Sequence, residues 1–89
     1  MDDKEIPDAF IVTVATEQGG FESDMALPSS LTVGELRGKI LDVLKALDEE
    51  KFRAWRGCRL CLGHRQLQDG ETLISAGAFG GSRLIAVEE

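Results

Sequence analysis

The stretch RLCLGHRQLQDGETL, residues 59–73, decides the fold of this chain. It begins with alternating residues in which Leu60 and Leu62 share one parity, a pattern typical of a strand with one buried face. A glycine follows, and the Asp-Gly pair at 69–70 is a strong turn signal. The pattern therefore predicts a strand, a turn, a short extended segment and a second turn, which leads into one helical turn over 72–74.

Two further strands are predicted upstream of this stretch. Residues 10–16 are rich in β-branched side chains, and residues 21–27 alternate along the chain as a half-buried strand does. The Gly-Gly pair at 19–20 can adopt the positive φ angles of a tight turn. We therefore expect a β-hairpin, and Pro28 is expected to end its second strand.

Residues 33–47 have the spacing of an amphipathic helix. Thr32 and Glu35 predict a capping box, in which each side chain accepts a hydrogen bond from the other residue's backbone N–H. Arg37 is expected on the exposed face. Apolar residues at intervals of three and four are expected on one buried face: Val33, Leu36, Ile40, Val43, Leu44 and Leu47. With a final strand over 82–87, the element order predicts a two-layer α+β domain. Its mixed β-sheet would have four to five strands, and the one main helix would pack on one face.

This element order, together with the motif QLQDGETL at 66–73, resembles the ubiquitin-like β-grasp family over residues 9–87. Within that family the chain is most similar to the bacterial YukD/EsaB proteins of type VII (WXG100/ESX) secretion systems. The segments MALP at 25–28, LTVGEL at 31–36 and AGAFGGSRL at 76–84 carry this narrower similarity. The resemblance implies a non-enzymatic accessory or regulatory protein that acts by binding a component of the secretion apparatus.

The end of the sequence bears on conjugation. A conjugated ubiquitin, or a sulfur carrier of this fold, needs a flexible tail that ends in Gly-Gly. This chain ends in Glu88-Glu89, and its Gly80-Gly81 pair precedes the last predicted strand. Cleavage there would remove Leu84, and the loss of one core leucine alone costs about 2–5 kcal/mol of stability. We therefore expect neither conjugation nor a thiocarboxylate role.

Length and charge narrow the classes of function further. The chain has 89 residues, 16 acidic and 10 basic side chains and a net charge of −6. One domain over 9–89 is expected after a flexible acidic tail over 1–8. The negative charge disfavours nucleic acid and anionic lipid as partners. No run approaches the ~20 apolar residues of a membrane helix, and the acidic start is not a secretory signal. We therefore expect a cytoplasmic protein without direct membrane insertion.

Cys58, Cys61 and the single histidine, His64, are the candidate metal-ligating or redox residues. A structural zinc site takes four ligands, and the chain holds no further Cys or His. Positions three apart on a strand point to opposite faces, so the two thiols are expected to diverge. His64 has no nucleophile or paired carboxylate to work with. We expect no catalytic residue, metal or cofactor, and keep a zinc- or redox-active protein using Cys58 and Cys61 as the alternative.

The sheet face opposite the helix is the candidate binding surface. Strand parity and the neighbouring turn predict seven residues for it: Ile11, Thr13, Arg59, Cys61, His64, Ile85 and Val87. Apolar side chains on a solvated sheet, with Arg59 and His64 at the rim, are typical of a patch that binds proteins. Ubiquitin-like domains use this same face. The expected partner is a protein, and a general ubiquitin-like adaptor domain is the alternative to a role in type VII secretion.

The segment 51–65 is basic and contains no acid; its charged residues are Lys51, Arg53, Arg56, Arg59 and Arg65. Phe52 and Trp55 lie within it and are expected to rest on the core. Arginine and an aromatic side chain together can clamp a nucleic-acid base, but a single Trp and a net charge of −6 favour a protein-binding or solvated surface.

Overall fold

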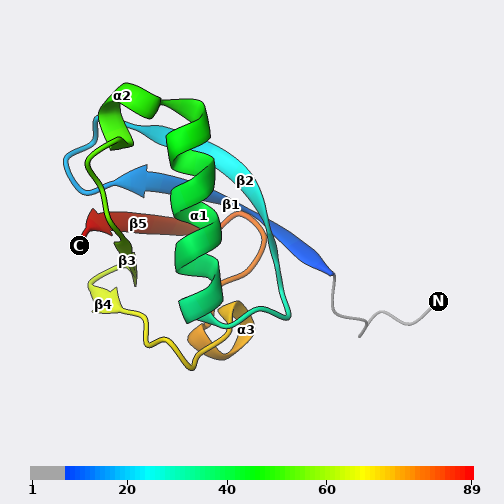
Figure 1. Cartoon of the computed structure of the whole chain (residues 1–89). Coiled ribbons are helices and arrows are strands. Elements are labelled where there is room, and N and C mark those ends of the chain that lie inside the picture. The colour runs from blue at the N-terminus through cyan, green and yellow to red at the C-terminus, as the bar shows by residue number, and fades with distance from the viewer. Residues whose placement is uncertain (1–7) are drawn as a thin grey trace.

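The computed structural model describes residues 8–89, and its elements follow the predicted order (Figure 1). The strands are β1 (Ala9–Thr16), β2 (Glu22–Pro28), β3 (Cys58–Leu62), β4 (Arg65–Gln66) and β5 (Arg83–Glu88). The helices are α1 (Val33–Leu47), α2 (Glu49–Phe52) and α3 (Leu73–Ala76). The hairpin, the main helix, the third strand and the last strand are therefore confirmed.

The start of the described chain is bound to the turn that follows β2. The carbonyl oxygen of Asp8 accepts the backbone N–H of Ser29 at 2.8 Å and the Ser29 hydroxyl at 3.1 Å. The remainder of the predicted tail, residues 1–7, lies outside the described residues.

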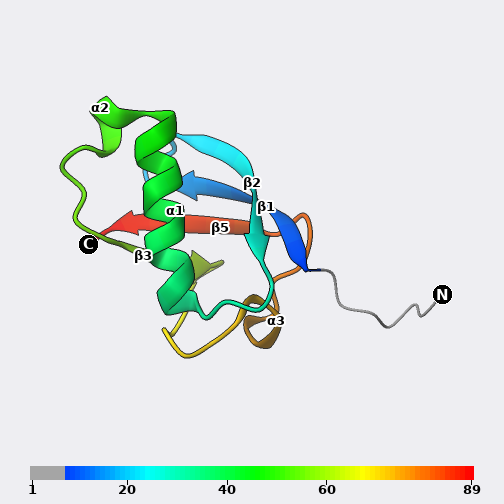
Figure 2. The same ribbon diagram turned by 45° about the vertical axis from the view of Figure 1, so that its right-hand side comes forward.

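The five strands form one mixed sheet in the order β2-β1-β5-β3-β4. The central strands β1 and β5 pair in parallel, whereas β1–β2, β3–β5 and β3–β4 are antiparallel. Helix α1 lies across one face of this sheet and leaves the other face uncovered by any described helix (Figures 1 and 2). The two-layer α+β architecture predicted from the sequence is thus confirmed.

The N-terminus of α1 is fixed by its own capping box and by a distant loop. The Thr32 hydroxyl accepts the Glu35 N–H at 3.3 Å, and the Glu35 carboxylate accepts the Thr32 N–H at 3.0 Å. The next two N–H groups of the helix, on Val33 and Gly34, donate to carbonyl oxygens of the 69–71 loop at 2.7 and 3.1 Å. A Cβ on Gly34 would lie 3.3 Å from the Asp69 side chain, so a larger residue there would press on this loop and shift it by a few tenths of an ångström.

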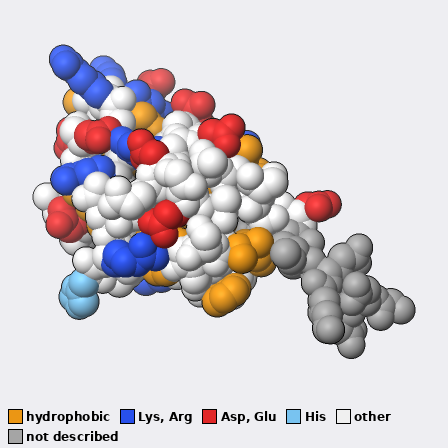
Figure 3. Space-filling view, turned by 90° about the horizontal axis from the view of Figure 1, so that it is seen from below, with side chains coloured by type: hydrophobic (Ala, Val, Ile, Leu, Met, Phe, Trp, Pro, Cys, Tyr) orange, Lys and Arg blue, Asp and Glu red, His pale blue; other side chains and the backbone are white. Residues whose placement is uncertain are grey.

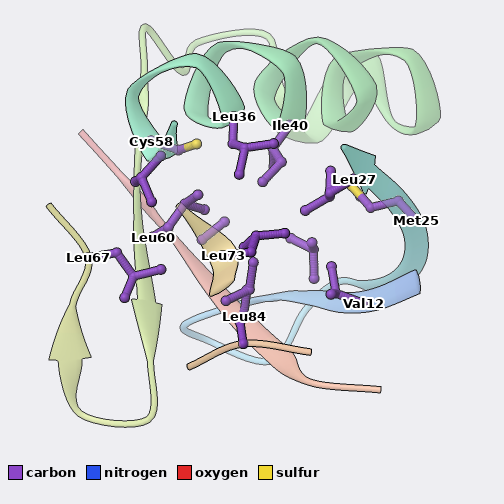
Figure 4. Close-up of a cluster of buried hydrophobic side chains, with 14 of the residues drawn as sticks. Val12, Met25, Leu27, Leu36, Ile40, Cys58, Leu60, Leu67, Leu73 and Leu84 are labelled. Atoms are coloured by element: carbon purple, nitrogen blue, oxygen red, sulfur yellow. The ribbon is translucent and has the colours of Figure 1, made fainter. Parts of the chain in front are cut away.

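The core lies between α1 and the sheet, where side chains of both layers point toward each other (Figure 4). Leu36, Ile40 and Leu44 are fully buried at successive turns of α1. The prediction that Leu47 belongs to this buried face is wrong, because its side chain is 55% exposed at the end of the helix. Val43 is only half-buried, and Leu41, which the spacing omitted, is buried instead.

An aromatic cluster closes the core at the end where Leu47 was expected. Phe52 of α2 is fully buried, and its ring meets Phe21 and Trp55 edge to face at centroid distances of 5.1 and 4.9 Å. This cluster explains the exposure of Leu47, since the chain turns back after α1 and supplies Phe52 to the core. The expectation that Phe52 and Trp55 rest on the core is confirmed.

Candidate functional site

Strand register decides which of the predicted patch residues are neighbours on the outer sheet face. On β3 and β5, Cys61 stands opposite Ile85 and Arg59 stands opposite Val87. Cys61, Ile85 and Val87 are each partly exposed, and Arg59 is exposed. These four residues therefore form one continuous surface, which we call the sheet patch: Arg59, Cys61, Ile85 and Val87.

A polar row separates Ile11 from the sheet patch. Thr13 of β1 stands between Asp24 of β2 and Arg83 of β5, and its hydroxyl donates to the Asp24 carboxylate at 2.6 Å. Arg83 in turn forms an ion pair with Glu22. Ile11 lies beyond this row, opposite Ala26. The structure thus does not bring the seven predicted residues together, because Thr13 belongs to the polar row and Ile11 lies on its far side.

His64 lies at the edge of the outer face, in the turn between β3 and β4. Gly63 has a φ of 64° in this turn, which allows the tight reversal that leaves His64 exposed. Arg59 makes no ion pair with any of residues 8–89. An apolar centre with a free guanidinium beside it is suited to contact with another protein surface.

The two cysteines occupy opposite sides of β3. Cys58 is 1% exposed on the helix side, and its thiol donates to the Arg37 carbonyl oxygen at 3.5 Å. Burial raises the pKa of Cys58 to about 11, so the group is a neutral thiol at physiological pH. Cys61 belongs to the outer face, where it stands opposite Ile85.

This placement bears on the zinc or redox alternative. The thiols diverge, as the strand geometry predicts, and could not ligate one ion without disruption of β3. Among residues 8–89, no group of three or more His, Cys, Asp or Glu side chains converges as a metal site would require. The buried neutral thiol of Cys58 is also poorly suited to redox exchange, which requires an accessible thiolate.

The basic segment 51–65 divides into a structural arginine and unpaired cations. Arg65 is structural: it pairs with Glu71 at 3.1 Å and donates to the Ala76 carbonyl oxygen at 2.9 Å. The Gln68 backbone N–H and, after it, Arg65 lower the pKa of Glu71. The remaining four side chains form no ion pair with residues 8–89: Lys51, Arg53, Arg56 and Arg59.

Arg37 has a role that helix periodicity did not predict. Its guanidinium donates to Asp69 at 2.7 Å, to Glu89 at 2.5 Å and to the Cys58 carbonyl oxygen at 2.6 Å. Hydrogen bonds with the two carboxylates, that of Asp69 first, raise the pKa of Arg37. The side chain therefore links α1 to the loop before α3, to the start of β3 and to the residue that follows β5.

An open hollow of about 280 Å³ lies where β1 turns away from β5. Thr16 contributes to its wall together with Lys51, Trp55 and Val87, so the hollow borders the sheet patch at Val87. The Thr16 hydroxyl is buried and has no hydrogen-bond partner among the described residues. This hollow could not be predicted from the sequence, since its walls come from three segments that lie far apart along the chain.

Comparison with solved structures supports the fold. The ubiquitin-like domain of the Mycobacterium tuberculosis type VII secretion system protein EccD1 has a TM-score of 0.73 and 23% identity, covering 90% of this chain and 98% of that chain. The EccD5 ubiquitin-like domain from Mycobacterium xenopi has a TM-score of 0.72 and 20% identity, covering 90% of this chain and 93% of that chain. Ubiquitin from Caldiarchaeum subterraneum has a TM-score of 0.67 and 24% identity, covering 91% and 94%.

A larger assembly contains the same fold. A chain of the MycP5-free ESX-5 inner membrane complex matches with a TM-score of 0.73 and 22% identity over 93% of this chain, but over only 22% of that chain. No protein-family model matches the sequence, and no curated protein matches it at a significant level. The likenesses show that this chain has the ubiquitin-like β-grasp fold, as the sequence predicted. Within residues 8–89, no helix has the length and apolar character needed to cross a bilayer.

Proposed function

We propose that this chain is a non-enzymatic ubiquitin-like protein that serves a bacterial type VII (WXG100/ESX) secretion system. It acts in the cytoplasm as an accessory or regulatory component, by binding another protein of the system. The observation that carries the proposal is the sheet patch, an apolar surface on the sheet face that α1 does not cover. Partly exposed Ile85, Val87 and Cys61 gain from burial against a partner, and unpaired Arg59 can meet an acidic group at the rim.

The link to secretion rests on the fold and the sequence motifs. Two of the similar solved structures are ubiquitin-like domains of EccD proteins, one of them described as a type VII secretion system protein. The similarity to the YukD/EsaB proteins points to the same kind of system. A folded, binding-only module fits such a role, since it can recruit or regulate a larger component without chemistry of its own.

Binding rather than conjugation is supported by the position of the internal Gly-Gly pair. The Gly81 N–H donates to the Ile11 carbonyl oxygen at 2.8 Å, so Gly80-Gly81 belongs to an ordered turn before β5. Cleavage after Gly81 would remove β5, which lies between β1 and β3, and with it the fully buried Leu84. A modifier released in this way would lose the centre of its sheet.

A direct binding measurement tests the proposal. The purified chain is titrated calorimetrically with the WXG100 proteins and the cytoplasmic domains of the FtsK-type ATPase from the same genome. We expect at least one of them to bind the wild type. Ile85→Glu and Val87→Asp each place a charge in the sheet patch, and a bound partner would have to bury that charge. Each variant should therefore weaken the binding at least tenfold, about 1.4 kcal/mol.

Leu47→Glu is the matched control, because it places the same charge on an exposed apolar residue of α1. This variant should bind as the wild type does, and circular dichroism should show that all three variants are folded. If folded Ile85→Glu and Val87→Asp bind as tightly as Leu47→Glu, the sheet patch is not the binding surface. If the wild type binds none of these proteins, the assignment to type VII secretion is wrong.

A further inference from the structure

A second apolar surface lies at the other end of the sheet, where three segments meet. The start of β1, the turn over 77–82 and α3 are joined there by backbone hydrogen bonds: Gly81 N–H to the Ile11 carbonyl at 2.8 Å, and Ala78 N–H to the Leu73 carbonyl at 2.8 Å. Each segment exposes one large apolar side chain: Ile11 (56%), Ile74 (38%) and Phe79 (58%). Figure 3, which views the molecule from below, shows hydrophobic side chains gathered at this end. We call Ile11, Ile74 and Phe79 the end patch.

The end patch is separate from the sheet patch. Along β1 and β5 the register places Ile11 four residues before Ala15, the partner of Ile85. At roughly 3.3 Å per residue this is about 13 Å along the strands. The polar row and the Arg83–Glu22 ion pair occupy the space between. One short apolar segment therefore cannot cover both patches without burying that ion pair.

The size and surroundings of the end patch indicate what kind of partner it fits. Its three side chains expose on the order of 300 Å² of apolar surface, which is within the range of functional patches on monomers. A stable dimer needs about 800 Å² from each partner, so self-association through this patch alone is disfavoured. The neighbouring turn residues are uncharged: Ser75, Gly77, Gly80, Gly81 and Ser82. The cations that adjoin it, Arg65 at the Ala76 carbonyl and Arg83 after the turn, are each paired with a glutamate. Because the chain also has a net charge of −6, this surface does not attract an anionic membrane.

We propose that the end patch binds a short apolar segment of a second protein, one that presents two or three aliphatic or aromatic side chains and no charge at its centre. This inference goes beyond the proposed function, which concerns the sheet patch alone. With two separate surfaces the chain acts as an adaptor that holds two protein partners at once. Phe79 is the expected anchor, because an aromatic ring at a turn offers the largest area at a small entropic cost.

A random peptide library displayed on phage tests the inference without reference to any secretion protein. Selection on the full chain should yield peptides with clustered apolar residues. Their synthetic forms should bind Phe79→Ser at least tenfold more weakly than the wild type, and should bind Ile85→Glu unchanged. Ile74→Ser provides a second variant, and chemical-shift changes in the labelled chain should centre on residues 11, 74 and 79.

Four results would overturn the inference. The first is that Phe79→Ser binds every selected peptide as the wild type does. The second is that Phe79→Ser and Ile85→Glu lose the same peptides, which would mean one surface rather than two. The third is sedimentation of the wild type as a dimer that Phe79→Ser converts to a monomer, which would make the occupant a second copy. The fourth is binding of phosphatidylglycerol vesicles by the wild type and not by Phe79→Ser. A peptide that Ile85→Glu fails to bind, but that Phe79→Ser still binds, occupies the sheet patch. The end-patch inference and the proposed function of the sheet patch can therefore fail independently of each other.

Discussion

Replacement of Arg37 by methionine should destabilise the fold by about 2 kcal/mol. Methionine retains much of the side-chain length and removes the three hydrogen bonds to Asp69, Glu89 and the Cys58 carbonyl oxygen. The carboxylates are 67% and 49% exposed, so each ion pair contributes only about 0.2–1 kcal/mol. The charge-assisted bond to the partly buried carbonyl adds about 1.5 kcal/mol.

Urea unfolding of Arg37→Met measures this loss, with Lys39→Met as the matched control. Lys39 lies on the same helix, is exposed and forms no ion pair with residues 8–89, so its replacement should change stability by less than about 0.5 kcal/mol. In 1 M salt the two ion pairs should contribute less to the free energy of unfolding, whereas the hydrogen bond to the Cys58 carbonyl oxygen should keep its contribution. The difference in stability between Arg37→Met and Lys39→Met should therefore become smaller but remain measurable. Equal stabilities of Arg37→Met and Lys39→Met at low salt would refute the linking role of Arg37.

Three further perturbations follow from individual contacts. Gly38→Ala should stabilise the fold by about 0.5–1 kcal/mol in urea unfolding, because an added Cβ meets nothing within 4 Å and alanine favours the helix; a loss of stability would contradict this. Thr16→Val should stabilise the fold by about 1 kcal/mol, since it removes a buried hydroxyl without a partner; thermal unfolding that shows a loss would mean that the hydroxyl is satisfied. The free energy of unfolding should fall as pH rises from about 9 to about 11, because the Cys58 thiol ionises near 9.0 in the unfolded chain and near 11 in the folded protein. Cys58→Val should lack this part of the pH dependence. If the free energy of unfolding changes equally with pH in the wild type and in Cys58→Val, Cys58 does not cause the change.

The parts of the fold that the sequence predicts are those set by local patterns. The capping box of α1 depends on residues three apart, and the hairpin depends on two neighbouring strands with glycines between them. The exposure of Leu47 could not be predicted in this way. Periodicity identifies a helix face, but it does not reveal that Phe52 returns from a later segment to close the same end of the core.

The candidate site shows the same limit. Parity correctly places Ile85 and Val87 on the partly exposed face of β5, because side chains alternate along any strand. The alternation of side chains does not predict which residues of two strands lie opposite each other. The parallel pairing of β1 with β5 places Ala15 opposite Ile85, and Ile11 lies four residues before Ala15 on β1. The linking role of Arg37 could not be predicted from the sequence either, since its carboxylate partners are 32 and 52 residues away along the chain.

Among residues 8–89, the groups with shifted pKa values lie at structural contacts. Shifted pKa values often mark active sites, where burial and charge prepare a group to react. Here the shifted groups are Arg37, Cys58 and Glu71, and each stabilises structure in the state it already holds at neutral pH: a charged guanidinium, a neutral thiol and a charged carboxylate. These groups fix loops to α1 and β3, while the sheet patch keeps its apolar side chains and the unpaired Arg59 on the open face. Such a division of roles suits a protein whose rigid frame presents surfaces to partners, and it requires that mutation of the sheet patch change affinity far more than stability.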